Sequence, residues 1–425
     1  MPGPVLSAPK GAAEGPLEGV RVADFTWVWA GPSCTMQLAH MGAEVIRMES
    51  ARRVCVLRML PPWPGGQPHP NRSGYFNQYN QGKRSITLDI SKPEGKGIAK
   101  KLVAISDIAA ENFAGTVIDR LGLGYQELRK VKPDLIMISM SGYGQTGPDA
   151  HYVSYGPAQV PLSGMSQLSG YKGWQPMHVG MSYGDPNAGL HAAFALLSAL
   201  YYRERTGKGQ YIDMSQWEST MAVTGDGIMH YTMNGEQPER NGSRVPEMAP
   251  HGVFRCAPGE PAAPGFPEED RWVSIACGSD DEWKAFCGVM ARPELADDPR
   301  FRTLAGRKAN EDALEDAIME WTLLQDPFEV MRACQAAGVA AFPPQMNREL
   351  AEDPHLNARG FFVEKEHPEV GVRKHAGIPW RMSETPCEVW RAAPVMGQDN
   401  EYVFGELLGL SSAQIAELVE REVIR

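Results

Sequence analysis

Residues 134–150, "DLIMISMSGYGQTGPDA", decide which kind of α/β protein this chain can form. The apolar run "LIMISM" is typical of a buried strand, and the glycines after it have the spacing G-x-G-x-x-G of a dinucleotide-binding turn. Such a turn opens directly into a helix and needs an acidic residue about 20 positions later. No helical apolar pattern follows here, and no Asp or Glu occurs between Asp149 and Asp185. The stretch therefore predicts a buried strand followed by a loop that serves a purpose other than nucleotide binding.

Short apolar segments of the same kind recur through residues 20–140. The segments "VRVADF", "AEVIRM", "SITLDI" and "DIAAEN" alternate with helical or turn segments, which is the rhythm of a parallel α/β sheet. Ser91 and Glu94 have the spacing of a capping box and predict a helix start. A second, long helix is predicted over residues 186–205, with Gly207 at its end.

The length of 425 residues is enough for two domains. Residues 1–16 predict a flexible tail, and residues 17–225 the first part of a large α/β domain. Between residues 234 and 270 the composition shifts to Gly, Pro and charged residues, which indicates a linker. We therefore assign residues 226–345 to a linker and a small α+β domain, and residues 346–425 to a C-terminal segment with a hairpin and a final helix.

Composition disfavours several function classes. A net charge of −11 disfavours a general nucleic-acid binder, because phosphate neutralisation needs a surplus of Lys and Arg. The longest apolar run, residues 192–202, is too short to cross a bilayer, so no membrane partner is expected. Seven cysteines, none within four residues of another, favour a reducing cytoplasm over a disulfide framework or a compact zinc site. The histidines follow no metal-binding spacing, and no metal site is expected.

Asp185 is the candidate reactive group, and two interpretations of it stay open. It stands where the long helix is predicted to begin, between Gly184 and Pro186, and Asp before Pro is typical of a capped helix. A carboxylate at a helix N-terminus is also held ionised by the helix dipole, and neighbouring N–H groups can stabilise an oxyanion formed by its attack.

Basic and aromatic side chains cluster near predicted strand ends. Lys83 and Arg84 precede one strand, while the basic residues around the end of an earlier strand are Arg47, Arg52, Arg53 and Arg58. Such clusters either hold phosphates or are solvated surface charge. Trp27 and Trp29 follow the first strand, at the end of an open α/β sheet where ligands bind, although core packing accounts for them equally well.

Several segments taken together resemble the class III CoA-transferase family, which contains formyl-CoA and carnitine CoA-transferases. They are "PLEGVRVADFTWVWAGPSCTMQLAHMGAEVIRME", "NQGKRSITLDI", "ENFAGTVIDRLGLGY", "SGYGQTGP", "GDPNAGLHAAFALLSALYYRERTGKGQYIDMS" and "APVMGQDNEYV". The likeness runs from Pro16 to the C-terminus. It implies a Rossmann-like large domain made from both ends of the chain, a smaller domain between them, and two ring-like subunits interlocked as a dimer.

The resemblance also implies roles for individual residues. Asp185 matches the nucleophilic aspartate of the family. The segments that match the CoA site contain Trp27, Val28, Trp29, Ala30, Arg47, Lys83, Arg84, Asn112, Phe113 and Arg120. The loop residues Tyr143, Gly144 and Gln145, together with Tyr155, are then expected beside the thioester. No tightly bound cofactor is expected, because the CoA thioester is itself a substrate.

The resemblance further implies that CoA moves from a donor thioester to a carboxylic acid through covalent aspartyl intermediates. Succinyl-CoA is the expected donor, and the aromatic residues favour an acceptor larger than oxalate, such as benzylsuccinate. One alternative is an α-methylacyl-CoA racemase of the same fold, although Tyr155 stands where that enzyme has a histidine and only His151 is nearby. Another is a CoA-binding subunit of a heteromeric transferase, so a homodimer and a heteromer with a homologous subunit both stay open.

Overall fold

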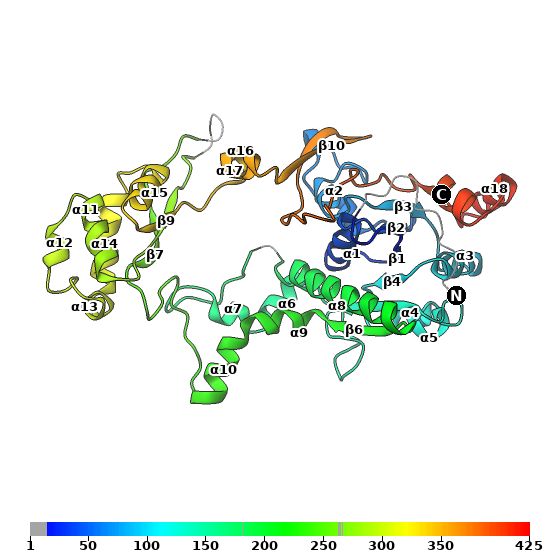
Figure 1. Cartoon of the computed structure of the whole chain (residues 1–425), viewed down its shortest axis with the longest axis horizontal. Helices are drawn as coiled ribbons and strands as arrows, with labels where there is room; N and C mark the ends of the chain where they lie inside the picture. The colour runs from blue at the N-terminus through cyan, green and yellow to red at the C-terminus, as the bar shows by residue number, and fades with distance from the viewer. Residues whose placement is uncertain (1–14, 181, 262–264, 266) are drawn as a thin grey trace. The chain divides into compact units, whose positions relative to one another are not determined.

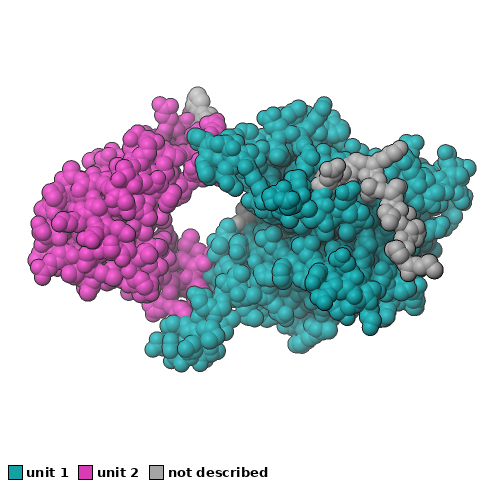
Figure 2. Space-filling model, in the orientation of Figure 1, with its two compact units in different colours: residues 1–166, 178–236, 354–425 teal, residues 167–177, 237–353 magenta. Residues whose placement is uncertain are grey.

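The computed structural model describes residues 15–180, 182–261, 265 and 267–425, and the chain forms two compact units (Figure 2). Unit 1 comprises Met1–Ser166, His178–Glu236 and Pro354–Arg425, so it contains both ends of the chain. Unit 2 comprises Gln167–Met177 and Gln237–Asp353. The chain therefore enters unit 2 twice.

Unit 1 is built on a six-stranded parallel sheet (Figure 1), which confirms the predicted α/β class. Its strands are β1 (Arg21–Asp24), β2 (Glu44–Glu49), β3 (Arg84–Thr87), β4 (Ile108–Glu111), β5 (Ile136–Ser141) and β6 (Tyr211–Ser215). The order β3-β2-β1-β4-β5-β6 is that of a doubly wound Rossmann fold. In this order the direction of winding reverses between β1 and β4, where ligands of such folds bind.

Helices cover both faces of this sheet because its strands are apolar on both sides. In β1, Val22 packs into a core with α1 (Ala30–His40) and α8 (Gly184–Thr206), whereas the next residue, Ala23, packs into a core with α3 (Pro93–Ala104). Continuous apolar strands are expected where both faces are buried. The helices α1 and α8 approach so closely that a Cβ added at Gly189 would lie 2.9 Å from the Ala30 carbonyl oxygen.

Short helices and a C-terminal segment complete unit 1. The helices are α2 (Gly74–Tyr79), α4 (Val117–Arg120), α5 (Tyr125–Leu128), α6 (Gly156–Leu162), α9 (Gln216–Met221), α10 (Gly225–Asn234) and α17 (Pro354–Ala358), and α7 (Met165–Leu168) leads into unit 2. The C-terminal segment forms the antiparallel hairpin of β10 (Phe362–His367) and β11 (Gly371–Ala376), followed by α18 (Ser412–Glu420). Asp399 of this segment accepts hydrogen bonds from Arg84 and from the Ser85 N–H, which ties it to the edge of the sheet.

Unit 2 has an antiparallel sheet of β7 (His251–Arg255), β8 (Trp272–Ala276) and β9 (Ala340–Phe342). Its helices are α11 (Asp280–Val289), α12 (Glu294–Asp297), α13 (Leu304–Ala309), α14 (Glu311–Thr322), α15 (Pro327–Ala336) and α16 (Asn347–Glu352). Trp283, Phe286 and Phe254 lie in its core. A separate core of this kind makes unit 2 a body in its own right.

Candidate active site

A cavity of about 570 Å³ opens in unit 1 at the carboxyl ends of the parallel strands. Trp27 and Val28 line it after β1, Asn112 and Phe113 after β4, and Asp185 at the start of α8. The cavity thus contains the point between β1 and β4 where the winding reverses. Six of the sequence-predicted site residues line this cavity: these five and Tyr155.

Asn112 joins the two segments on either side of that point. Its side chain accepts a hydrogen bond from the Trp27 N–H (2.7 Å) and donates one to the Trp27 carbonyl (2.8 Å). Val28, the residue after Trp27, has a φ of 57°, a left-handed conformation that is strained for a β-branched side chain. The Asn112 side chain therefore helps to hold a turn whose left-handed backbone a valine at position 28 would not favour by itself.

This turn directs the N-terminus of α1 at the carboxylate of Asp185. The N–H groups of Ala30 and Gly156 and the hydroxyl of Ser182 donate hydrogen bonds to that carboxylate. Ala30 is the first residue of α1, Gly156 the first of α6, and Asp185 itself lies in the first turn of α8. The positive ends of three helices therefore converge on one carboxylate.

Asp185 is buried, with 6% of its surface exposed, and this burial raises the pKa of its carboxyl group to about 6. The N–H and hydroxyl donors counteract that rise only in part. Gly156 is needed for the arrangement, because a Cβ there would overlap the Asp185 carboxylate. The helix start also differs from the sequence prediction: Tyr183 is the N-cap residue, and α8 begins at Gly184.

Three aromatic rings, none of them among the residues that line the cavity, form a cluster in unit 1. The Trp29 ring centroid lies 5.3 Å from that of Tyr75 and 4.9 Å from that of Tyr79. Burial raises the pKa of Tyr75 above its usual range, and the negative charges of Tyr79 and Asp185 add to the rise, which indicates that Tyr75 lies near Asp185.

Arg52 and Arg53 line the same cavity after β2. The Arg53 guanidinium lies 6.0 Å from the Trp27 ring centroid, and Arg52 forms an ion pair with Glu422. Both arginines are exposed, so an anionic ligand can reach them. The sequence marked them as part of a basic cluster, but the resemblance did not assign them to the CoA site.

Arg47, Lys83 and Arg84, by contrast, are buried and do not line this cavity. Arg47 lies 3.3 Å from the Glu49 carboxylate, but none of its three guanidinium nitrogens has a hydrogen-bond partner among the described residues. The Lys83 ammonium donates to the Pro32 carbonyl and to Asn80, each at 3.0 Å, and burial lowers its pKa to about 8. Arg84 is bonded to Glu44 (2.9 Å) and Asp399 (3.2 Å).

The glycine-rich loop after β5 does not open directly into a helix, as predicted, although the short helix α6 forms later in the stretch where no helical pattern was expected. Gly144 and Gly147 have left-handed backbones, with φ of 83° and 91°, and the next helix, α6, begins only at Gly156. The Gln145 N–H donates to Asp213 (2.8 Å), which anchors the loop on β6.

Three other site residues predicted from the sequence lie as follows. The Tyr143 ring packs against those of Tyr152 and Trp217. Tyr155 lines the cavity and is exposed. Arg120 ends α4, is exposed, and is not among the described residues that line the cavity.

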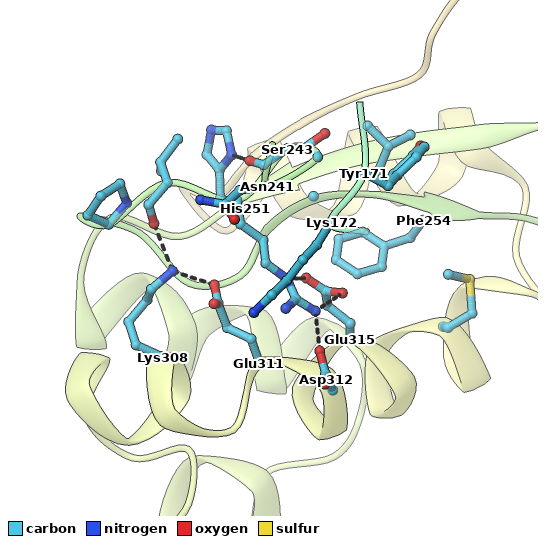
Figure 3. A pocket seen from close by; sticks show the side chains of 17 residues that line it. Tyr171, Lys172, Asn241, Ser243, His251, Phe254, Lys308, Glu311, Asp312 and Glu315 are labelled. Atoms are coloured by element: carbon cyan, nitrogen blue, oxygen red, sulfur yellow. Dashed lines mark hydrogen bonds and ion pairs between the residues drawn. The ribbon is translucent and has the colours of Figure 1, made fainter. Parts of the chain in front are cut away.

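Unit 2 has a second cavity, of about 630 Å³ (Figure 3). Arg244 lines this cavity and donates hydrogen bonds to Glu315 at 2.7 and 2.6 Å and to Asp312 at 2.6 Å. Lys308 is bonded to Glu311 and to the Val245 carbonyl. Both of these cations are therefore neutralised within the cavity wall.

Among residues 15–180, 182–261, 265 and 267–425, no group of three or more His, Cys, Asp or Glu side chains could hold a metal ion. Within the same residues, every helix is too short or too polar to cross a membrane. The side chains that line the cavity of unit 1 carry carboxyl, amide, guanidinium, hydroxyl and aromatic groups.

Comparison with known proteins decides the family. The family model of CoA-transferase family III matches residues 17–400. The chain belongs to CoA-transferase family III. It is 33% identical to a succinyl-CoA–D-citramalate CoA-transferase of Chloroflexus aurantiacus, over 96% of this chain and 98% of that protein. It is also 31% identical to the β subunit of a succinyl-CoA–L-malate CoA-transferase of the same organism, over 96% and 98%.

A solved structure of a CaiB/BaiF family protein from Brucella suis has the same fold as this family III chain. Its TM-score is 0.84 at 30% sequence identity, and the match covers 93% of this chain and all of that one. The enzyme class and the α/β fold expected from the sequence are thereby confirmed.

Proposed function

We propose that this family III enzyme transfers CoA from succinyl-CoA to a dicarboxylic acid, with Asp185 as the nucleophile. The observation that carries the proposal is the environment of Asp185: a buried carboxylate in the ligand cavity, hydrogen-bonded by two helix N-termini and a hydroxyl. A nucleophile has to be ionised and within reach of its substrate. With a pKa of about 6, Asp185 is ionised at neutral pH.

In the first half of the reaction, a carboxylate oxygen of Asp185 attacks the thioester carbonyl, and the C–S bond breaks to release CoA thiolate. The product on the enzyme is a mixed anhydride of succinate and Asp185. The thiolate then attacks the Asp185 carbonyl, succinate leaves, and an aspartyl-CoA thioester forms. The oxyanion of this step develops on an Asp185 oxygen, which the N–H groups of Ala30 and Gly156 already contact.

The second half repeats these steps in reverse order with the acceptor. The acceptor carboxylate attacks the aspartyl thioester, releases the thiolate and forms a second anhydride. The thiolate then attacks the acceptor carbonyl, which gives the new thioester and restores the Asp185 carboxylate. Burial of Asp185 limits access of water, which would hydrolyse each intermediate.

The residues in the cavity wall support a proposal for where each part of CoA binds. Trp27 and Phe113, with ring centroids 6.4 Å apart, offer apolar surface, while Arg53, whose guanidinium lies over the Trp27 ring, offers positive charge for the phosphates of CoA. The buried hydrogen bonds of Lys83 and Arg84 favour a supporting role for these two residues over direct phosphate contact. The CoA contacts expected at Trp27, Val28, Asn112 and Phe113 remain part of the proposal.

The cluster of Trp29, Tyr75 and Tyr79 is our proposed wall for the acid. Aromatic rings provide a large apolar surface, which suits an acceptor bulkier than oxalate, such as benzylsuccinate. The two Chloroflexus relatives are named for succinyl-CoA as donor and for D-citramalate or L-malate as acceptor. Their names support the choice of donor and of a dicarboxylate acceptor.

We also propose that the enzyme acts as an oligomer in the reducing cytoplasm. Every residue of α10 is at least partly exposed, and Met233 there and Phe194 on α8 are 74% and 73% exposed. Apolar helices of this kind fit a protein interface, either in an interlocked homodimer or with a homologous subunit. All seven cysteines are free thiols. Light scattering of the purified chain at micromolar concentration separates a homodimer from a monomer that awaits a different subunit.

The transfer itself is tested by incubating the protein with succinyl-CoA and a panel of acids that includes oxalate, malate, citramalate and benzylsuccinate. New CoA thioesters are quantified by mass spectrometry. We expect transfer to at least one dicarboxylate and none with Asp185→Ala. Exchange of the α-proton of a 2-methylacyl-CoA with deuterated water, without any transfer, would instead identify a racemase.

A further inference from the structure

Glu111, the last residue of β4, has a buried carboxyl group that takes part in no step of the proposed mechanism. Only 1% of its surface is exposed. Its Oε2 accepts a hydrogen bond from the Phe113 N–H at 2.7 Å. Its Oε1 is buried without a hydrogen-bond partner among the described residues. A buried carboxylate with an unsatisfied oxygen is costly to fold and needs an explanation.

The bond to Phe113 shapes the turn that faces the ligand cavity. Asn112 and Phe113 both line the cavity, and Asn112 holds Trp27 through two hydrogen bonds. Phe113 packs against the Trp27 ring. Glu111 thus fixes the backbone from which two cavity-lining side chains project.

The groups that face Glu111 come from three other elements. Asp119 on α4 and Asp213 on β6 place negative charge near it, Tyr211 on β6 is a further titratable neighbour, and Ser139 on β5 brings its hydroxyl close. Burial is the largest cause of a raised pKa at Glu111, and the two aspartates raise it further. Hydrogen bonds from Ser139 and the Phe113 N–H lower it, and the pKa of Glu111 is about 7. Each of these neighbours is neutral or negative, so the ionised form has no cation among them.

We propose that Glu111 is a positioning residue whose negative charge holds the Asn112–Phe113 turn in the shape that binds CoA, so that CoA affinity depends on the ionisation state of Glu111. The inference rests on the proposed function, because it concerns the same CoA site. When Glu111 is ionised, its bond to the Phe113 N–H is charge-assisted and about twice as strong as a neutral one. When a proton occupies Oε1, that oxygen becomes a donor towards the Ser139 hydroxyl, and Oε2 is left as a weaker, neutral acceptor.

The direct test is calorimetric titration of the wild-type enzyme and of Glu111→Gln with 3′-dephospho-CoA between pH 5.5 and 8.5. Removing the 3′-phosphate removes a ligand group that itself titrates near pH 6. Glutamine keeps the shape and an acceptor oxygen but carries no charge. We expect the wild-type Kd to fall about fivefold as pH rises through 7, in line with the strength of one charged hydrogen bond, and that of Glu111→Gln to stay near the acid-form value.

Asp119→Asn provides a second measurement that does not depend on the folding of Glu111→Gln. Asp119 is exposed, and its loss removes a negative charge that faces Glu111. The midpoint of the wild-type pH dependence is expected to move to lower pH, whereas the surface control Asp316→Asn on α14 leaves it unchanged. The same pH dependence in wild type and Glu111→Gln, or an unmoved midpoint in Asp119→Asn, would overturn the inference. Absence of CoA binding by the wild-type enzyme at every pH would contradict the proposed function itself.

Discussion

The two cavities of this protein hold their charged side chains in opposite ways. In unit 1, the Asp185 carboxylate is contacted by N–H and hydroxyl groups, and its pKa is raised to about 6. In unit 2, the Arg244 guanidinium meets two carboxylates, which raise its pKa beyond its usual range. A charge without a counter-ion is costly to bury but available to react, whereas a paired charge contributes to the fold and has little left to offer a substrate. The contrast favours the cavity of unit 1 as the reaction site.

Asp185→Asn tests that comparison most directly, and we expect it to lower kcat more than the other variants described below. The amide cannot form an anhydride, so kcat for CoA transfer should fall by a factor on the order of 10⁴ or more, as for other covalent nucleophiles. Asp185 makes no side-chain cap of α8, so the circular dichroism spectrum should stay that of the wild type. A folded variant that keeps substantial transfer activity would contradict the assignment of Asp185.

Gly156→Ala should have the next largest effect, because the new Cβ would overlap the Asp185 carboxylate and displace it. A misplaced nucleophile lowers kcat about 10²-fold. Gly97→Ala is the matched control: Gly97 lies within α3, nothing lies within 4 Å of an added Cβ, and alanine should stabilise the helix by about 0.5–1 kcal/mol. Equal kcat values for the two variants, measured with saturating succinyl-CoA, would rule out this account of Gly156.

The pH dependence of kcat tests whether the Asp185 carboxylate in the cavity of unit 1 is the attacking group. Attack needs the Asp185 carboxylate, whose pKa is about 6, so kcat should be constant above pH 7 and fall about tenfold per pH unit well below 6. This slope is measured with the donor saturating, which separates it from any effect of pH on CoA affinity. A kcat that stays unchanged down to pH 5 would argue against Asp185 as the attacking group.

The contribution of Asp185 to the free energy of unfolding should change with pH in the direction opposite to kcat. The pKa of Asp185 in the folded protein is above its ordinary value of 3.8, so the folded state holds this proton more tightly than the unfolded state. Stability is therefore greatest below about pH 4 for this group and falls as pH rises to 6, by up to about 3 kcal/mol. Urea unfolding at pH 5 and pH 8 should show a smaller difference between the two pH values for Asp185→Asn than for the wild type.

The smallest effect on catalysis is expected in unit 2. Arg244→Gln leaves Asp312 and Glu315 without their cation and should cost about 1 kcal/mol of unfolding free energy, because these groups are partly solvated. Because the charge was already neutralised, kcat should stay within about threefold of the wild type. A loss of activity comparable to that of Gly156→Ala would assign the unit 2 cavity a part in the reaction.

Much of unit 1 was predictable because its signals are local. The apolar segments of residues 20–140 predicted five of the parallel strands, and α8 ends at Gly207 as predicted, where the structure shows a left-handed conformation. The capping box at Ser91 and Glu94 was wrong: Lys92 is the N-cap residue of α3, and the Ser91 hydroxyl bonds to Asp89 instead. Competition from an aspartate two residues away is not contained in the capping pattern.

The parts of the site that the sequence did not reveal depend on distant partners. Arg84 is bonded to Asp399, 315 residues away along the chain, so nothing near Arg84 indicates that it is buried and paired. The converging N–H groups of Ala30 and Gly156 are backbone atoms, which no residue pattern identifies. Asp185 was singled out because a helix start is a local signal, whereas the rise in its pKa results from burial and required the fold.

The central claim, that Asp185 carries the activated group, is tested most directly by trapping it. The enzyme is incubated with succinyl-CoA, digested, and analysed by peptide mass spectrometry with and without hydroxylamine, using Asp185→Asn as the control. We predict CoA in thioester linkage on the peptide that contains Asp185, conversion to a hydroxamate by hydroxylamine, and no label in the control. Catalytic turnover without any adduct at Asp185, or with the label on another residue, would contradict the account.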